Sequence, residues 1–425
     1  MKFMKLKDTF IAVSLCGLMV CACYACSSGN DTPIDDPTAT VTLNVAANEM
    51  QEISTNLKLS AQASYLWHME SAPDSLFVLQ DSTSARALFA AITPGVYHIT
   101  LSATDNGQHY NRSYQVSVSA ASAVCSPYIA EVYDFNPAPG QFINEIPAYV
   151  KGNSKADMIA ACRKALVGKE KGDLISLGGF GGSVVFGFDH TVLNIKGRRD
   201  FRVLGNAFFA AANPNPNAPR GGSCEPGIVM VAYDKNHNSK PDDDEWYEIA
   251  GSEYTNSKTV HDYQITYSRP TTEAHDPDGE GELASIAQYI YWTDNQGHSG
   301  YKIKNIYHDQ SYYPAWITDA KLVFGGTLLP NNAIDEGTES AHYWVQYCYG
   351  YGYVDNVPNN DIDSAIDIDW AVDKNGNKVH LPGIDFVKVY CAMNKECGWL
   401  GETSTEVMGA VDLHVTGVNL PTNGK

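Results

Sequence analysis

The sequence predicts an all-β protein in which a small N-terminal β-sandwich precedes a larger, jelly-roll-like β-sandwich with few helices. Two patterns support this prediction. Short runs of alternating apolar and polar residues recur along the chain, and turns rich in Gly, Asn and Pro separate them. Strands do not alternate regularly with helices, and no repeat of about 20–50 residues is visible, which argues against α/β and solenoid folds.

The N-terminus predicts export and lipid attachment. Lysines precede an apolar run over residues 10–22, which is close to the about 7–15 residues of a secretory signal and shorter than the about 20 of a membrane span. Small residues then precede Cys23 and Cys26, as in a bacterial lipoprotein signal. We expect residues 1–25 to be a lipoprotein signal peptide, with the lipid on Cys23 or alternatively on Cys26, and residues 26–40 to be a flexible tether. A plain signal peptide with incidental cysteines is the other interpretation.

The composition fits a folded, exported chain. Hydrophobic residues make up 44% of its 425 residues, and the net charge is −20. A strongly acidic chain repels phosphate backbones, so we expect no nucleic-acid partner, whereas divalent cations suit this charge. The cysteines beyond the signal region show no zinc-like spacing, and the sequence does not choose between disulfides and buried free thiols. They are Cys125, Cys162, Cys224, Cys348, Cys391 and Cys397.

Residues 41–120 contain short strand-like runs at the spacing of a small β-sandwich. Turn signals at Pro94-Gly95 and Asp105-Asn106-Gly107 separate these runs. The run Tyr65-Leu66-Trp67 and the segment from residue 94 to 105 resemble PKD and related immunoglobulin-like domains. The resemblance implies a PKD-like immunoglobulin-like domain that serves as a spacer and carries no chemistry.

Residues 126–420 predict one large jelly-roll-like domain that binds a ligand. The convincing helix runs from Ser154 to Val167, because Ser154 and Asp157 can cap its start and apolar residues share one of its faces. Strand patterns dominate the rest, and long loops account for the size of the domain. The main strand-like runs are residues 184–188, 227–233, 246–249, 263–267, 286–292, 343–349 and 384–390.

The sharpest chemical motif lies in residues 234–245. A calcium loop of the EF-hand kind places its donors at positions 1, 3, 5, 7, 9 and 12. These positions hold oxygen donors here, namely Asp234, Asn236, Asn238, the carbonyl of Lys240, Asp242 and Glu245. Ser239 replaces the usual turn glycine and strand-like runs flank the loop, so we expect Ca²⁺ to bind in a loop between two strands. A solvated turn without a cation is the alternative.

Aromatic residues of the C-terminal region are candidates for ligand recognition. Rigid rings beside amide and carboxylate groups suit a flat polar ligand such as a sugar or a corrinoid. Many of the rings will instead belong to the strand core. The candidate ligand-binding residues are Trp292, Trp316, Trp344, Tyr351, Tyr353 and Trp399.

Catalytic motifs are not evident. The glycines of residues 178–182 are followed by neither a lysine nor a helix, so they do not predict a phosphate site. Glu402 and Glu406 would lie about 13 Å apart on one strand, farther than the about 5 Å of a retaining glycosidase. The acidic stretch 355–369 could attract a cation, but a polar loop explains it better. We assign no catalytic residues, and a binding protein is favoured over an enzyme.

Several longer stretches carry one family resemblance. They are residues 175–189, 200–208, 225–231, 385–389 and 401–407. Together they are similar to the PKD-like cell-surface lipoproteins of gut Bacteroidetes, whose C-terminal part is an uncharacterised jelly-roll-like domain. The resemblance implies a lipid-anchored protein on the outer membrane, often beside a TonB-dependent transporter for glycans or cobamides, and it transfers no catalytic residues.

We therefore expect a calcium-stabilised surface lipoprotein that binds a nutrient, a cobamide or a glycan, for TonB-dependent uptake. A glycan-active hydrolase or lyase and a structural adhesin are the alternative functions. The sequence leaves the identity of the ligand and the oligomeric state open.

Overall fold

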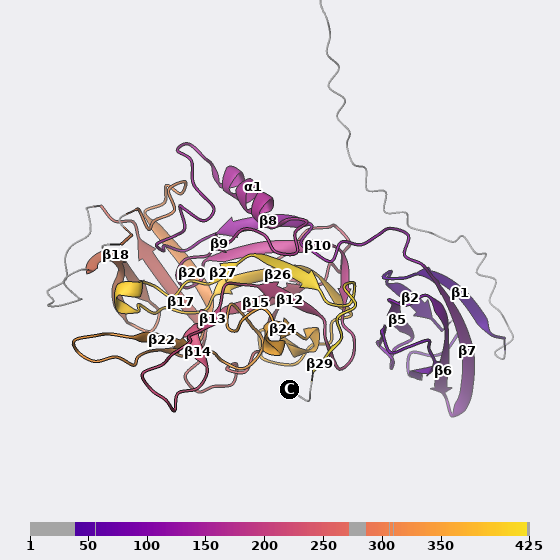
Figure 1. Cartoon of the computed structure of the whole chain (residues 1–425). Helices are drawn as coiled ribbons and strands as arrows, with labels where there is room; N and C mark the ends of the chain where they lie inside the picture. Colours follow the sequence, from indigo (N-terminus) through magenta and orange to yellow (C-terminus); the bar gives the residue numbers. More distant parts are fainter. Residues whose placement is uncertain (1–38, 56, 272–285, 306, 309, 423–425) are drawn as a thin grey trace, which may run out of the picture.

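A computed structural model describes residues 39–55, 57–271, 286–305, 307, 308 and 310–422. A small N-terminal domain lies at one end of the molecule, beside a larger C-terminal domain (Figure 1). The predicted signal peptide, with Cys23 and Cys26, and nearly all of the predicted tether lie outside the described residues. Within the described part, no helix is long and apolar enough to cross a membrane.

The N-terminal domain consists of two facing sheets. One sheet has the order β1 (Val41–Ala46), β7 (Gln108–Ser119), β6 (Gly95–Asp105) and β3 (Ser64–Ser71), and the other has the order β2 (Gln51–Ser54), β5 (Arg86–Ala91) and β4 (Phe77–Gln80). β1 runs parallel to β7, and the other pairs are antiparallel. Trp67, Phe89, Tyr97 and Tyr114 fill the space between the sheets, because alternate residues of each strand face inward.

A seven-stranded antiparallel sheet forms the centre of the C-terminal domain. Its order is β25 (Ala371–Val372), β16 (Trp246–Ile249), β15 (Gly227–Ala232), β26 (Gly383–Cys391), β10 (Ser183–Leu193) and β8 (Glu131–Asn136), and β23 (Tyr353–Val354) also pairs with β15. The helix α1 (Lys155–Leu166) lies beside β8 (Figure 1). Ser154 and Asp157 form the predicted capping box, and Met158, Cys162 and Leu166 are buried in the main core.

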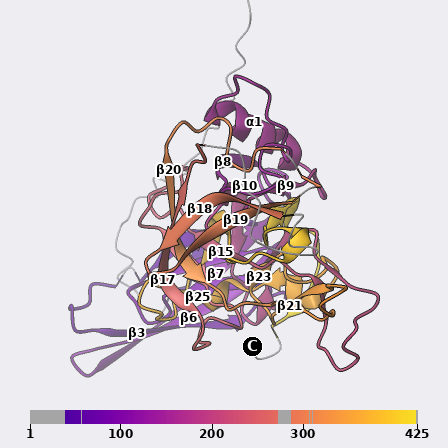
Figure 2. The same cartoon turned by 90° about the vertical axis from the view of Figure 1, so that its left-hand side faces the viewer.

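Smaller sheets surround this centre. They are β19 (Ser299–Asn305), β18 (Ile286–Asp294), β17 (Val260–Ser268) and β20 (Lys321–Leu328); β13 (Phe208–Phe209), β14 (Gly221–Ser223), β22 (Trp344–Tyr347) and β21 (Ala333–Asp335); β24 (Ala365–Ile366), β12 (Phe201–Leu204) and β28 (Gly409–Asp412); β27 (Glu406–Val407) and β9 (Ile175–Ser176); and β11 (Arg198–Arg199) and β29 (Leu420–Pro421). Figure 2 views the domain from the side of β18, β19 and β20. Short 3-10 turns lie at η2 (Ile362–Ser364), η3 (Ile368–Trp370) and η4 (Gly398–Leu400). The predicted all-β class with sandwich-like packing is confirmed.

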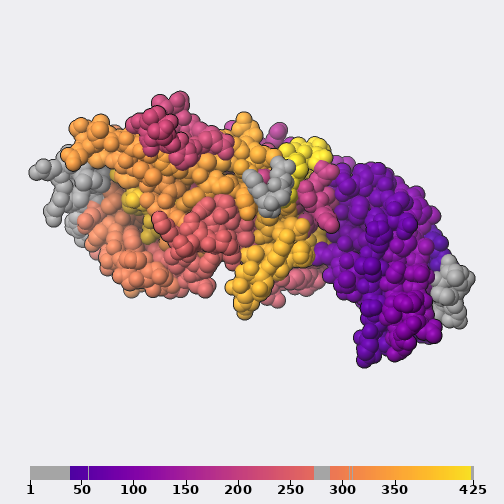
Figure 3. Space-filling view, turned by 90° about the horizontal axis from the view of Figure 1, so that it is seen from below, coloured from indigo at the N-terminus to yellow at the C-terminus, as the bar shows by residue number. Residues whose placement is uncertain are grey.

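The two domains pack against each other. Val78 and Ala90 of the N-terminal domain form one buried apolar cluster with Leu193 and Ile195 of the C-terminal domain. The Arg198 guanidinium donates a hydrogen bond across the contact to the hydroxyl of a serine in the N-terminal domain. Figure 3 shows the continuous surface where the domains meet. Apolar burial across a domain contact favours a fixed arrangement over independent domain motion.

Candidate functional site

An open, acidic pocket of ≈ 330 Å³ lies in the C-terminal domain. Segments far apart in the sequence line it: the turn after β8, the ends of β12 and β14, strand β22, and the stretch from η4 to β27. The lining residues that the structure describes include no Lys, Arg or His. They are Gln141, Phe142, Ile146, Leu174, Asn206, Ser223, Glu225, Gln346, Cys397, Leu400, Gly401, Glu402, Ser404 and Glu406.

Three carboxyl groups meet at this pocket. One oxygen each of Glu225, Asp355 and Glu406 lies within 4.8 Å of the other two. Asp355 is the best held, since its Oδ1 accepts hydrogen bonds from the backbone N–H of Asn206 (2.8 Å) and Ala207 (2.7 Å), and its Oδ2 accepts one from the backbone N–H of Glu406 (2.9 Å). These contacts fix the cluster through the backbone of two distant segments.

Neighbouring polar groups hold the two glutamates of the cluster. The backbone N–H of Ser404 donates to Glu225 Oε1 (3.1 Å), and the Gln346 amide donates to the same oxygen (3.3 Å). The Ser404 hydroxyl donates to Glu406 Oε1 (2.8 Å). Ser404 thus connects both glutamates, and this places them at the pocket wall in fixed orientations.

The electrostatics of the cluster favour protonated carboxyl groups. Burial raises the pKa values of Glu225, Asp355 and Glu406, and charge repulsion from Glu225 raises those of Asp355 and Glu406 further. A carboxylic acid can donate a hydrogen bond as well as accept one. The pocket therefore offers both donors and acceptors to a bound molecule.

Glu402 is a fourth acidic residue of the pocket. Burial, and then the charge of Glu396, raise its pKa from 4.5 to about 8. Its Oε1 accepts a hydrogen bond from the backbone N–H of Gln141 (2.6 Å), whereas its Oε2 is buried without a hydrogen-bond partner among the described residues. Glu396 itself forms an ion pair of 3.0 Å with the fully buried Lys302. Glu402 is therefore a buried acid that remains largely protonated at neutral pH.

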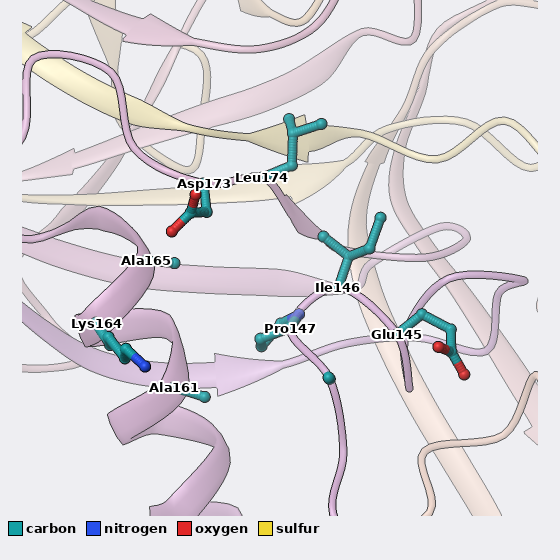
Figure 4. Close-up of a pocket in the computed structure, with 9 residues that line it drawn as sticks. Glu145, Ile146, Pro147, Ala161, Lys164, Ala165, Asp173 and Leu174 are labelled. Atoms are coloured by element: carbon teal, nitrogen blue, oxygen red, sulfur yellow. The ribbon is translucent and has the colours of Figure 1, made fainter.

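A second pocket adjoins the acidic one. It measures ≈ 440 Å³, and Ile146 and Leu174 line both pockets. Figure 4 shows α1 on one side of it, with Ile146, Pro147 and Leu174 across from the helix. Lys164 and Asp173 are among its lining residues, so this pocket carries charges of both signs. A ligand larger than the acidic pocket can extend over this neighbouring surface.

The predicted calcium residues all lie in the connection between β15 and β16. Asp234 and Glu245 are buried, and Asp242 is half-buried. The amides of Asn236 and Asn238 each donate a hydrogen bond of 2.7 Å to Asp242 Oδ2. Lys240 donates its backbone N–H to Asn238 Oδ1 (2.8 Å), so its carbonyl belongs to the same turn.

The structure distributes the six predicted ligand-binding aromatic residues over several places. Trp316 stacks on Phe135 and Tyr149 in the main core, and Trp292 packs against the core of the β17–β20 sheet. Tyr353 is buried, and Tyr351 packs on Trp370. Trp344 and Trp399 lie nearest the acidic pocket: Trp344 adjoins Gly398 of η4, and Trp399 is exposed beside the pocket residue Leu400.

The sequence analysis did not predict the acidic pocket. It treated Glu402 and Glu406 as neighbours on one strand, whereas strand β27 begins only at Glu406. Glu402 instead forms an isolated bridge with Glu396 and turns toward the pocket, so both glutamates line one cavity. Asp355 belongs to the acidic stretch that was interpreted as a polar loop. The signal that could have identified it is that Asp355 follows the buried pair of β23 directly.

The described cysteines outside the signal region are all free thiols. Cys224 precedes the pocket residue Glu225, and its thiol forms a hydrogen bond with that of Cys348. This contact and the nearby Arg220 lower the pKa of Cys348 to about 7, although burial opposes the shift. The two thiols lie close together at the edge of the pocket region.

Comparisons with known proteins identify the N-terminal domain. Residues 28–118 match a family model that describes a PKD domain. No curated protein matches the chain. The solution structure of the PKD domain from KIAA 1837 protein is 24% identical, and the match covers 21% of this chain and 87% of that chain with a TM-score of 0.17.

Two other solved structures match a smaller share of their own length. A 2,6-sialyltransferase from Vibrionaceae Photobacterium sp. is 16% identical, covering 26% of this chain and 22% of that chain with a TM-score of 0.17. A quinonprotein alcohol dehydrogenase-like protein from Bacteroides thetaiotaomicron is 13% identical, covering 23% and 22% with a TM-score of 0.15. The family match and the observed sandwich agree, and residues 28–118 of this chain contain a PKD domain.

Proposed function

We propose that this chain is a surface-exposed, lipid-anchored binding protein that captures a small polar nutrient in its acidic pocket for uptake by a TonB-dependent transporter. The observation that carries the proposal is the open pocket, whose walls combine buried carboxyl groups with amide and hydroxyl groups. The export signal and the candidate lipid sites Cys23 and Cys26 support the location. The transporter rests on the family resemblance alone.

The chemistry of the pocket favours a neutral ligand rich in hydroxyl groups. Carboxyl groups with raised pKa values both donate and accept hydrogen bonds, and an anionic ligand would meet no cationic side chain among the described lining residues. The volume of ≈ 330 Å³ lies at the lower end of the range of small-molecule pockets, about 300–1,000 Å³. One or two sugar units of a glycan fit this space better than a whole cobamide, so a glycan is the first candidate nutrient.

Calorimetric titration of the whole chain in detergent with a glycan panel and with cyanocobalamin tests the proposal. Leu400→Trp should narrow the pocket mouth and weaken glycan binding at least tenfold. Val418→Trp is the matched control, because Leu400 and Val418 are both surface aliphatic residues, 38% and 40% exposed, and Val418 does not line the pocket. Equal binding by the two variants, or no binding of any glycan or cobamide by the unmodified chain, would contradict a nutrient site in this pocket.

A glycan-active hydrolase or lyase is the second candidate, and Glu402 is the observation that favours it. A carboxyl group whose pKa is about 8 is protonated at neutral pH, as the general acid of glycoside cleavage must be. Incubation of the chain with each bound glycan, followed by product analysis, separates the two functions. Intact glycan supports a binding protein, and cleaved glycan whose formation stops in Glu402→Gln supports the enzyme.

A further inference from the structure

The loop between β15 and β16 contains a buried carboxylate oxygen that the protein leaves without a partner. Glu245 is 3% exposed, and its Oε1 accepts a hydrogen bond from the backbone N–H of Lys235 (2.9 Å). Its Oε2 is buried and has no hydrogen-bond partner among the described residues. Burying a carboxylate is unfavourable unless hydrogen bonds or a cation compensate for its lost hydration. Glu245 therefore indicates a missing ligand at this position.

The other oxygen-bearing side chains of the loop turn toward the same interior. Asp234 is buried, and its two carboxylate oxygens accept the backbone N–H of Asn238 (3.0 Å) and of Ser239 (2.7 Å). Asp242 Oδ2 lies 2.7 Å from the amide nitrogens of both Asn236 and Asn238. The side chains at loop positions 3, 5 and 9 thus meet at one point, enclosed by a backbone that folds around Asp234.

The loop is also fixed to the central sheet. Asp385 of β26 accepts a hydrogen bond from the backbone N–H of Asp234 (2.7 Å) through Oδ2, and from the Thr191 hydroxyl (2.6 Å) through Oδ1. The first residue of the loop is therefore held by a strand from the centre of the sheet. At the other end, Trp246 pairs with Ala232 directly after Glu245.

We propose that residues 234–245 bind one Ca²⁺ ion and that this ion clamps the β15–β16 hairpin of the central sheet. The donors are Asp234, Asn236, Asn238, the Lys240 carbonyl, Asp242 and both oxygens of Glu245. Amide rotation of the two asparagines exchanges nitrogen for oxygen, so that their oxygens face the ion. All the donors are oxygens, and their number and mixed origin suit Ca²⁺, whereas Mg²⁺ requires a smaller and more regular shell.

Titration of the whole chain, freed of metal by a chelator, tests the proposal with CaCl₂ and MgCl₂ as probes. We expect one Ca²⁺ per chain, a melting temperature that rises with Ca²⁺, and a weaker response to Mg²⁺. Glu245→Gln keeps the size of the side chain and an acceptor for the Lys235 N–H, yet it should weaken Ca²⁺ binding at least 100-fold. Asp242→Asn, a second variant at a half-buried position, should weaken it at least tenfold.

Asp243→Asn is the matched control, because Asp243 is an exposed carboxylate between the ligand positions of the same loop. It removes the same charge as Asp242→Asn, and its Ca²⁺ affinity should stay within twofold of the unmodified chain. Circular dichroism at high CaCl₂ establishes that each variant is folded. The proposal is overturned if the unmodified chain shows no stoichiometric Ca²⁺ binding, or if Asp243→Asn weakens binding as much as Glu245→Gln and Asp242→Asn do. Either result leaves the pocket proposal untouched, because glycan binding is measured separately.

Discussion

Strand β15 carries an acidic site at each of its ends, and the two sites are built in opposite ways. Glu225, of the pocket cluster, precedes the strand, and Asp234, the first residue of the loop, follows it. The loop takes all its oxygen donors from residues 234–245. The pocket collects its lining residues from segments between Gln141 and Glu406, which only the folded domain brings together.

This difference separates two ways of holding carboxylates together. In the loop, local turns orient the side chains, and each donor lies within a few residues of the next. In the pocket, backbone N–H groups of distant segments hold the carboxyl groups, as the hydrogen bonds from Ala207 and Glu406 to Asp355 show. Acidic residues of the pocket therefore serve folding and ligand binding at once, whereas those of the loop can be changed with less effect on the fold.

Replacing Asp355 with Ala gives the sharpest test of this contrast. The change leaves the backbone N–H groups of Asn206, Ala207 and Glu406 without their acceptor. Each buried donor without a partner costs about 1–3 kcal/mol, so the free energy of unfolding should fall by about 3–5 kcal/mol. Urea unfolding at constant CaCl₂ measures this loss.

The loop supplies the matched control. Asp243 is exposed, so Asp243→Ala should change the free energy of unfolding by less than about 0.5 kcal/mol. Asp355→Asn keeps one acceptor oxygen and should lie between the two alanine variants. Equal losses for Asp355→Ala and Asp243→Ala would show that the pocket carboxylates are not part of the folded framework.

The dependence of stability on pH tests the pocket more gently. Glu402 has a pKa of about 8 in the folded chain and 4.5 as its ordinary value. Between these values the unfolded chain releases the proton and the folded chain keeps it, so stability falls as pH rises through this window. We expect Glu402 to account for a loss of about 2–4 kcal/mol from pH 4.5 to pH 8.

Glu402→Gln removes this titration and retains an acceptor for the Gln141 N–H. Thermal unfolding across the pH range should therefore show a shallower decline for the variant. Glu170→Gln is the comparison, because Glu170 is an exposed glutamate outside the pocket and its variant should follow the unmodified chain. A Glu402→Gln variant with an unchanged slope would mean that Glu402 is ionised in the folded chain at neutral pH.

The same contrast explains how far the sequence predicted the molecule. The turn at Asp105-Asn106-Gly107 was predicted from local signals, and the structure gives Asn106 and Gly107 the positive φ angles of a tight turn between β6 and β7. The capping box of α1 was predicted for the same reason. The loop 234–245 could be recognised because its donors are consecutive.

The acidic pocket could not be predicted in this way, because its geometry depends on tertiary packing. A strand model keeps Glu402 and Glu406 apart, but the chain between η4 and β27 is irregular, and the two side chains line one cavity. Tyr353 illustrates the reverse case: β23 pairs with β15, so this tyrosine is buried in the core rather than displayed on a surface. Its candidacy rested on composition, which does not reveal the direction of a side chain.

The smallest expected effect concerns the backbone of the loop. Ser239 occupies the loop position at which calcium loops carry glycine, and its φ of 59° lies in the left-handed region. A side chain at such a φ costs about 1 kcal/mol relative to glycine. Ser239→Gly should therefore raise the free energy of unfolding by up to about 1 kcal/mol, and the Ca²⁺ affinity of the loop should rise or stay equal.

Two substitutions sharpen this last comparison. Ser239→Ala keeps the strained backbone and should leave the stability nearly unchanged, which separates relief of strain from loss of the hydroxyl. Asp243→Gly places a glycine in the same loop at a residue that does not have a positive φ, so it should lower stability by about 0.5–1 kcal/mol through added chain entropy in the unfolded state. Urea unfolding at saturating CaCl₂ measures all three variants. A lower stability for Ser239→Gly than for Ser239→Ala would mean that the loop does not hold residue 239 in the left-handed conformation that brings Asp234 and its neighbours around one point.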